Sequence, residues 1–112
     1  MNDEKRGPGS IRVQKPLEIT YSANCPPIQA RIEDISETGF FLDNTNALLV
    51  DSEIEFFLDL PGESESMRIK GRGRVVWIQP TVGAGVQFLD LSQENRETIR
   101  FFVASIYFGH TE

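Results

Sequence analysis

Side chains for catalysis and metal binding are scarce in this sequence. Its 112 residues include one cysteine, Cys25, and one histidine, His110, close to the C-terminus. A single cysteine excludes an intramolecular disulfide and a zinc cluster, and a lone histidine in a frayed tail provides no base for a nucleophile. The carboxylates are scattered, and their spacing indicates no matched acid/base pair. We therefore expect no enzymatic activity, no metal site and no cofactor.

Positive charge and long apolar runs are also in short supply. Lys and Arg number 11 against 17 Asp and Glu, which gives a net charge of −6 and a pI near 4.8. This charge repels nucleic acids and anionic membranes at long range. No apolar run of about 18 residues and no basic, apolar leader occurs, which predicts neither a membrane span nor a secretory signal. We expect a cytoplasmic protein that binds no DNA or RNA and does not insert into membranes.

Six stretches with strand-like patterns are followed by one helical pattern. The predicted strands are residues 12–21, 28–35, 39–43, 54–60, 67–78 and 82–89, and the predicted helix is 93–108. Ser92 is the expected N-cap of this helix, and Gly109 lies where a C-cap is expected. The pattern indicates an all-β fold, a small six-stranded antiparallel β-barrel with a C-terminal helix. A single domain, 12–109, would follow a flexible basic arm, 1–11, and precede a tail, 110–112.

The predicted helix has more aromatic residues than one buried face requires. The apolar positions that recur at helical spacing are Ile99, Phe102, Val103 and Ile106. Phe101, Tyr107 and Phe108 widen this stripe. Two interpretations are open: the helix covers one end of the sheet, or the surplus aromatic residues form a surface for a partner protein or a second copy.

The stretch Asp34-Ile-Ser-Glu-Thr-Gly39 separates the second and third predicted strands. Asp and Ser accept hydrogen bonds from nearby backbone N–H groups, and Gly adopts φ > 0 without steric cost, so one interpretation is a turn at a hairpin corner. The other interpretation is the rim of a ligand site. A carboxylate accepts from the N1–H and N2–H₂ edge of guanine, a hydroxyl donates to a phosphate, and a glycine lets a flat ring approach the backbone.

The motif Asp34-x-Ser36-x-x-Gly39 resembles the [D/N]-x-S-x-x-G signature of PilZ domains, the bacterial receptors for cyclic di-GMP. Two later stretches are similar to strands of that family, Lys70-Gly-Arg-Gly-Arg-Val-Val-Trp77 and Gly83-Ala-Gly-Val-Gln-Phe88. With the closing helix, the resemblance covers roughly residues 12–108. It implies a PilZ-like barrel, cyclic di-GMP as the ligand and a downstream effector protein as the partner.

The resemblance also gives a function to the N-terminal arm. PilZ domains open with R-x-x-x-R, and Arg12-Val13 matches the second arginine and the start of the first strand. The first arginine position is occupied by Pro8, and the nearest guanidinium belongs to Arg6. Because an arginine binds bidentately to a phosphate or to guanine O6 and N7, two arginines make a clamp. We expect weak binding in which Arg6 loops back and Lys5 assists; on composition alone, the arm is a solvated tail.

Two features of the fifth predicted strand also have alternative interpretations. By alternation Trp77 shares a face with Gly71 and Gly73, and a lone tryptophan in such a strand is typical of a core; the alternative is a stacking surface for the ligand. The opposite face carries four cations, Arg68, Lys70, Arg72 and Arg74. They form either a solvated stripe that offsets acidic neighbours or an attractive patch for a dianionic ligand or an acidic partner.

Three functions are compatible with these features. The first is a receptor that binds cyclic di-GMP between the arm and the signature turn. Its ligand residues are Arg6, Arg12, Asp34, Ser36 and Gly39, with auxiliary contacts from Lys5 and Trp77. The second is an adaptor with weak or no cyclic di-GMP binding, which is a monomer or weak homodimer and contacts proteins through its aromatic helix. The third, a barrel for single-stranded nucleic acid, is disfavoured by the acidic composition.

Overall fold

The computed structural model describes residues 11–23, 26–43, 48–62 and 65–109. The strands are β1 (Arg12–Ser22), β2 (Ile28–Ser36), β3 (Gly39–Asp43), β4 (Glu53–Leu60), β5 (Met67–Gln79) and β6 (Gly83–Asp90), and the helix is α1 (Gln93–Tyr107). Predicted and observed bounds agree within one or two residues. Lys5, Arg6, Cys25, the loop 44–47 and the tail 110–112 lie outside the described residues.

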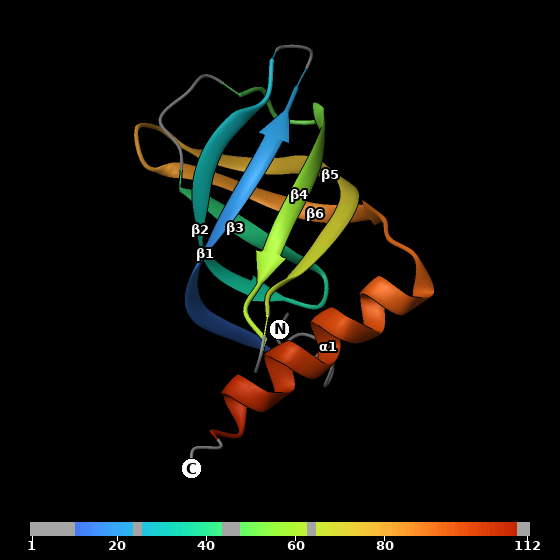
Figure 1. The fold of residues 1–112 in the computed structure, drawn as a ribbon. Coiled ribbons are helices and arrows are strands. Elements are labelled where there is room, and N and C mark those ends of the chain that lie inside the picture. Colours follow the sequence, from blue (N-terminus) through green and yellow to red (C-terminus); the bar gives the residue numbers. More distant parts are fainter. Residues whose placement is uncertain (1–10, 24–25, 44–47, 63–64, 110–112) are drawn as a thin grey trace.

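The strands form a closed barrel in the order β1-β2-β3-β6-β5-β4, and β4 completes it by pairing with β1. All the strand pairs are antiparallel. Two consecutive three-stranded meanders are therefore joined edge to edge, with α1 across one end of the barrel (Figure 1). The predicted six-stranded antiparallel barrel with a C-terminal helix is confirmed.

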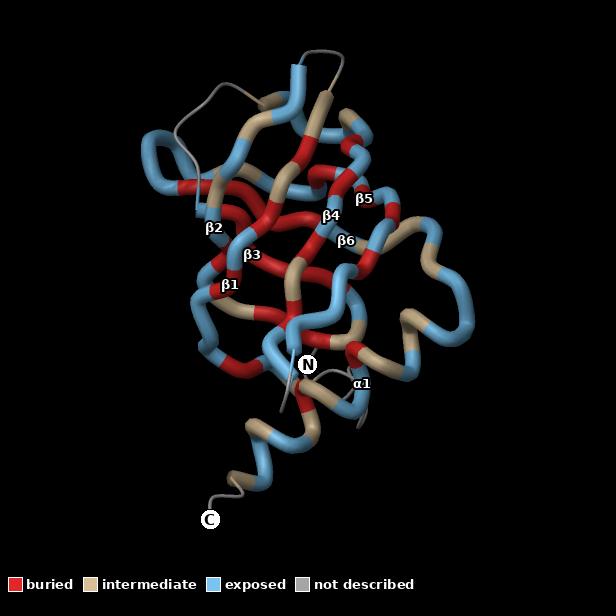
Figure 2. Tube along the Cα trace, viewed as in Figure 1, coloured by how far each residue is buried: buried red, intermediate tan, exposed pale blue. Residues whose placement is uncertain are grey.

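Alternation along the strands fills the barrel with apolar side chains. On β4, Ile54, Phe56, Leu58 and Leu60 are each at most 1% exposed, whereas Glu55 between them faces solvent. Buried and exposed positions alternate along much of the strands (Figure 2). The rings of Phe40, Phe56 and Phe88 meet there, with centroid separations of 5.4 to 5.8 Å. Aromatic packing of this kind contributes about 0.5–1.5 kcal/mol per pair beyond area burial.

The helix begins and ends as its capping residues predict. The Ser92 hydroxyl accepts a hydrogen bond from the Asn95 N–H at 3.0 Å, and Gly109 follows the last turn with φ +71°. Ile99 and Val103 are buried against the barrel end, at 0% and 3% exposure. The helix therefore covers one end of the sheet, as one of the two interpretations expected. Within the described ranges, no helix is long and apolar enough to cross a membrane.

Two of the register irregularities in the barrel, one in β5 and one in β2, change the faces on which functional candidates lie. Trp77, expected in the core, is 48% exposed because β5 has an extra residue between Val75 and Trp77 relative to β6. Asp34, which belonged both to the predicted strand 28–35 and to the signature stretch, lies within β2, next to a bulge that separates it from Ile32. Each bulge puts two consecutive side chains on the outer face, because the extra residue shifts the period-two alternation by one.

Candidate functional site

A groove lies on the barrel wall where the end of β2 and the start of β3 meet the β5–β6 hairpin. Its volume is about 670 Å³, which is within the range of about 300–1,000 Å³ of small-molecule pockets. We call it the Arg12 groove. Its lining includes Arg12, Glu33, Asp34, Gly39, Phe41 and Trp77. Four residues singled out in the sequence, Arg12, Asp34, Gly39 and Trp77, are thus brought together, whereas Ser36 lies behind the wall.

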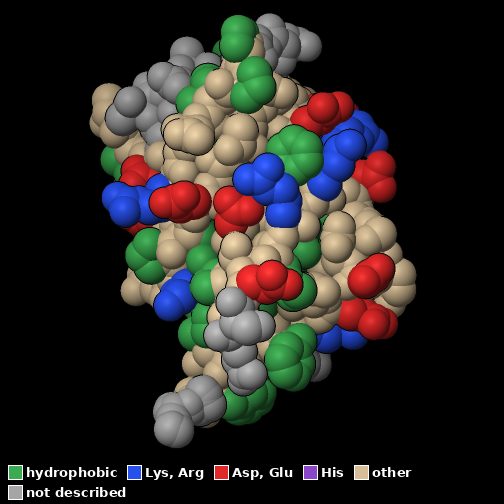
Figure 3. All heavy atoms as spheres, in the orientation of Figure 1, with side chains coloured by type: hydrophobic (Ala, Val, Ile, Leu, Met, Phe, Trp, Pro, Cys, Tyr) green, Lys and Arg blue, Asp and Glu red, His purple; other side chains and the backbone are tan. Residues whose placement is uncertain are grey.

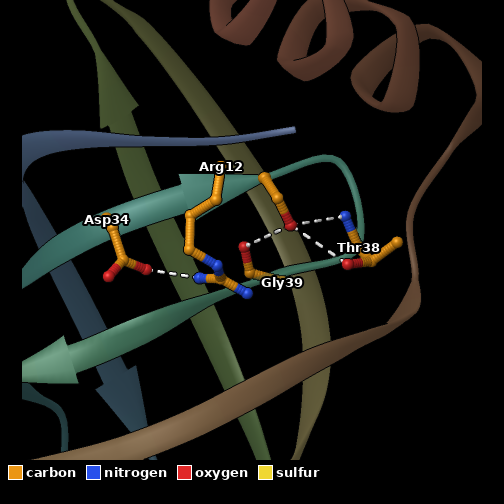
Figure 4. Close-up of polar contacts among 5 residues, drawn as sticks. Arg12, Asp34, Thr38 and Gly39 are labelled. Carbon is orange, nitrogen blue, oxygen red and sulfur yellow. Dashed lines mark hydrogen bonds and ion pairs between the residues drawn. The ribbon is translucent and has the colours of Figure 1, made fainter. Parts of the chain in front are cut away.

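The main polar contact in the Arg12 groove joins β1 to β2. A guanidinium nitrogen of Arg12, Nη1, donates to the Oδ1 of Asp34 (Figure 4). The two residues are 22 positions apart in the sequence, and the antiparallel register brings them together because Arg12 pairs with Ser36 and Gln14 pairs with Asp34. The Arg12 side chain is 45% exposed and that of Asp34 is 20% exposed. Both charged groups therefore remain accessible from the groove.

Both bulges described above open onto this groove. The bulge in β2 turns Glu33 and Asp34 outward, and the bulge in β5 does the same for Val76 and Trp77; all four side chains line the groove. A regular strand would have pointed Asp34 into an apolar core, where an unpaired carboxylate is strongly unfavourable. The two irregularities thus form the site, and bulges often re-aim side chains beside functional sites.

The signature turn is held by Ser36, which is 1% exposed. Its Oγ accepts from the Thr38 N–H at 3.1 Å and lies 3.0 Å from the Thr38 Oγ1 and 3.4 Å from the Gly39 carbonyl oxygen (Figure 4). The hydroxyl is therefore engaged within the turn. In this structure, Ser36 shapes the turn, and its direct contact with a ligand stays a prediction.

Trp77 lies flat against a glycine on the neighbouring strand. A Cβ placed on Gly85 would be only 2.1 Å from the indole Nε1, so the absence of a side chain there makes room for the ring. The Phe41 ring packs beside the indole, with centroids 5.4 Å apart and planes inclined by 33°. The result is a supported and half-exposed aromatic surface on the groove wall, which suits stacking of a flat ring.

Replacing Gly85 by alanine is expected to displace the Trp77 ring. We expect a loss of about 1–3 kcal/mol in unfolding free energy, typical of overpacking, and a shifted emission maximum, since Trp77 is the only tryptophan in the sequence. Chemical denaturation followed by fluorescence measures both quantities. The control is Leu49→Ala, which trims an exposed residue that does not line the groove and should leave the emission unchanged. Identical spectra for Gly85→Ala and the unaltered protein would contradict this packing.

The groove carries more negative than positive charge. Among its described lining residues, Arg12 is the single cation, opposed by the carboxylates of Glu33 and Asp34. The cationic stripe of β5 does not line this groove, and its three arginines are paired with carboxylates. Arg68 donates to Asp59 at 3.1 Å, Arg72 to Glu53 at 2.8 Å, and Arg74 lies 3.6 Å from Glu53. This supports the interpretation that the stripe offsets acidic neighbours.

The signature turn is tied directly to the helix. The Arg100 Nε on α1 donates to the Glu37 Oε1 at 2.9 Å, and the Glu37 side chain is only 19% exposed. Glu37 sits between Ser36 and Gly39, inside the motif. A shift of this turn would therefore change the contact between Glu37 and Arg100, in the middle of α1.

The comparisons with known proteins agree with the fold. A family model described as PilZ domain matches residues 4–105. This chain belongs to the PilZ domain family. No curated protein matches it. As the sequence resemblance implied, the barrel and its helix are a PilZ fold.

Two solved structures show the same PilZ fold at low sequence identity. The Bacillus subtilis inhibitor of motility (MotI/DgrA) superposes with a TM-score of 0.82 at 11% identity, covering 92% of this chain and 52% of the other. The PilZ domain of CeSA from a cellulose-synthesizing bacterium superposes with a TM-score of 0.56 at 17% identity, covering 88% and 95%. This chain thus spans about half the length of the Bacillus protein. At these identities, the likeness is one of fold.

Several residues of this PilZ domain's groove and turn were missed by sequence reasoning. Glu33, Phe41 and Gln87 line the groove, and Glu37 joins the turn to α1. Strand alternation indicated that Glu33 faces outward but not that it borders a site, and Phe41 looked like an ordinary core residue. Among the described residues, no group of three or more His, Cys, Asp or Glu is placed to hold a metal ion.

Proposed function

We propose that this PilZ domain binds cyclic di-GMP in the Arg12 groove and passes the signal to a protein partner. The observation that carries the proposal is the Arg12–Asp34 contact: two residues assigned to the ligand by separate motifs meet at the rim of one groove. Family membership supports the same ligand class. Trp77, the only tryptophan of the sequence, lines the same groove.

Each of these residues offers a contact that suits part of a cyclic dinucleotide. The Arg12 guanidinium presents donors to a phosphate or to guanine O6 and N7. The Asp34 carboxylate accepts from the guanine N1–H and N2–H₂ groups. The Trp77 indole offers a face on which a base stacks, and Phe41 fixes the orientation of that face. Gly39, two residues before Phe41 on β3, also lines the groove and adds no side chain to it.

The affinity we propose is weak, for two physical reasons. First, Arg12 is paired with Asp34, so the ligand has to share or replace an existing ion pair. Exposed pairs of this kind contribute about 0–1 kcal/mol, a modest barrier. Second, Glu33 and Asp34 outnumber Arg12 in the groove, so a second cation must come from elsewhere. Arg6 and Lys5 are the candidates in the arm, and ordering that arm opposes binding by about 1–2 kcal/mol per residue fixed.

A route for the signal is suggested by the Glu37–Arg100 ion pair. A ligand that contacts Asp34 and Gly39 bears on the same short turn that holds Glu37. Because Glu37 is bound to α1, a shift of the turn changes the contacts of the helix. We propose that this contact differs between the bound and free states, because a ligand shifts a conformational equilibrium only through such a difference.

The second candidate function is an adaptor that binds partner proteins with little or no cyclic di-GMP. It is favoured by the exposed aromatic residues of α1, among which Phe101 is 76% and Phe108 is 74% exposed. It is also favoured by the excess of acidic over basic groups in the Arg12 groove. The two functions differ in one requirement, since the adaptor needs the helix surface and not the groove.

Calorimetric titration of the intact chain with cyclic di-GMP tests the proposal. We expect saturable heat together with a change in Trp77 fluorescence of the same midpoint, since the indole is in the groove. Cyclic di-AMP is the matched control ligand, because adenine has no N1–H and no N2 amino group for Asp34 to accept from. Absence of heat at high micromolar cyclic di-GMP would reject the receptor and leave the adaptor.

A further inference from the structure

A second groove, away from the Arg12 groove, runs between α1 and the adjoining ends of β4 and β5. Its lining includes Leu60, Met67, Glu94, Glu97, Phe101 and Phe102. We call it the Phe101 groove, and its volume is about 700 Å³. Figure 3 shows hydrophobic side chains gathered along the lower end of the molecule, where α1 lies. Contiguous exposed apolar surface, unlike scattered apolar residues, often marks an interaction site.

We infer that the Phe101 groove is a docking site for a basic amphipathic helix of a partner protein. The inference deepens the proposed role by naming the chemistry of the partner, and it does not depend on whether the Arg12 groove binds a nucleotide. It is carried by the shape of the groove, its apolar floor and its charge.

The shape of the Phe101 groove fits a helix. Its helical wall comes from residues spaced by three, four and seven along α1, such as Glu94, Glu97, Phe101 and Ser105. These positions stack on one face over about three turns, or roughly 16 Å. The other wall is the β4–β5 end, with Pro61 and Met67. A channel of this length between a helix and a hairpin is suited to a helix that inserts side chains at matching spacing.

The apolar part of the groove is exposed although the core beneath it is complete. Leu60 at its base is 1% exposed, whereas Phe101 is 76% and Met67 is 46% exposed. The neighbouring helical residues Ile99 and Val103 already cover the barrel end. Phe101 and Met67 therefore contribute little to the fold, and a helix seated between them would remove both from water. Aromatic residues and methionine are enriched at the centres of protein interfaces.

The charge of the groove selects among possible occupants. Glu94 and Glu97 stand on its helical wall, and no Lys or Arg is among its described lining residues. A second copy of this chain would bring the same acidic wall and a net charge of −6 toward an identical partner. A helix with Lys or Arg beside its apolar stripe instead meets opposite charge, which favours encounter and fixes its orientation. The groove therefore fits a basic helical partner better than self-association.

Fluorescence anisotropy with labelled model peptides tests this inference on the full chain. The probe is an 18-residue peptide of Leu and Lys arranged with one apolar face. Two controls are a peptide of the same composition without an apolar face and a peptide with Glu in place of Lys. We expect the amphipathic Leu/Lys peptide to bind at least tenfold more tightly than either control. Equal binding of the Leu/Glu peptide would overturn the charge assignment, and equal binding of the scrambled peptide would overturn the helical one.

Variants locate the binding on this groove. Phe101→Ser is expected to weaken the Leu/Lys peptide at least tenfold, and Glu94→Gln with Glu97→Gln to weaken it several-fold and reduce its salt dependence. The matched control is Leu49→Ser, which removes an apolar residue of similar exposure, 74%, that does not line the groove. An affinity for Phe101→Ser within twofold of the unaltered chain would overturn the site.

Two further measurements separate this inference from its rivals. Sedimentation equilibrium of the chain alone should show a monomer; a dimer that Phe101→Ser dissociates would mean that a second copy fills the groove and would overturn the partner assignment. Cyclic di-GMP titration of Phe101→Ser should match that of the unaltered chain. Peptide binding and cyclic di-GMP binding are therefore separate readouts, so that each proposal can be rejected without the other.

Discussion

Arg12→Ala is expected to lower the affinity for cyclic di-GMP by about 10- to 100-fold, to below detection if the unaltered domain binds weakly. Losing one charge-assisted bidentate contact corresponds to about 1–3 kcal/mol, or one to two decades in affinity. Arg12 is the single cation among the described residues of its groove, so no neighbour there replaces it. The measurement is calorimetric titration of both proteins at one salt concentration, since screening alters every contact to a phosphate.

Arg74→Ala is the matched control for Arg12→Ala. Its side chain is 44% exposed, against 45% for Arg12, and it also pairs with a carboxylate, that of Glu53, but it does not line the groove. Both variants should fold with similar stability, because exposed ion pairs contribute about 0–1 kcal/mol each. If Arg74→Ala weakens binding as much as Arg12→Ala does, the effect comes from net charge, and the assigned site is wrong.

The part played by the arm is tested in the same titration. Arg6→Ala should weaken binding if Arg6 substitutes for the missing first arginine, and Pro8→Arg should strengthen it by restoring the R-x-x-x-R spacing. The gain expected from a second fork is again about one to two decades. Arg6→Ala without effect, beside a strong effect of Arg12→Ala, would show that the arm gives no such contact.

Most of the architecture was accessible from the sequence because local rules and tertiary packing agree. Ile54, Phe56, Leu58 and Leu60 alternate in the chain and all face the core, and Ser92 caps the helix that its position predicts. Where each local preference points to the same structure, reading the pattern is enough. The family motif added the expectation that Arg12 and Asp34 serve one ligand.

The site was harder to predict, because it depends on departures from those rules. Strict alternation places Trp77 inside with Gly71 and Gly73, yet an extra residue in β5 turns it to the surface. The extra residue follows from the register with β6, which depends on a pairing across the chain and not on local preference. The Glu37–Arg100 contact spans 63 positions and has no periodic signal at all. Functional sites are where local rules are expected to fail.

Gly39→Ala is expected to destabilise the domain by about 1–3 kcal/mol or more, with a melting temperature lower by roughly 5–15 °C. A Cβ at this position would lie 2.0 Å from the Val86 carbonyl oxygen and 3.0 Å from the Gln87 Cα. Both are backbone atoms of β6, which cannot rotate away as a side chain would. The change therefore pushes β3 from β6, one of the two junctions that join the meanders of the barrel. Thermal and urea unfolding measure the loss.

Gly109→Ala is the matched control for Gly39→Ala, because it makes the same chemical change where no atom lies within 4 Å of the added Cβ. It costs only the strain of a left-handed residue, about 1 kcal/mol, at the helix end. The contrast separates the two interpretations of the signature glycine. If Gly39 served only to let a ligand approach, its alanine variant would unfold like the unaltered domain and lose cyclic di-GMP alone. The close approach to β6 instead predicts that stability falls even without ligand. If stability and cyclic di-GMP binding both fall, Gly39 serves the barrel and the ligand site together.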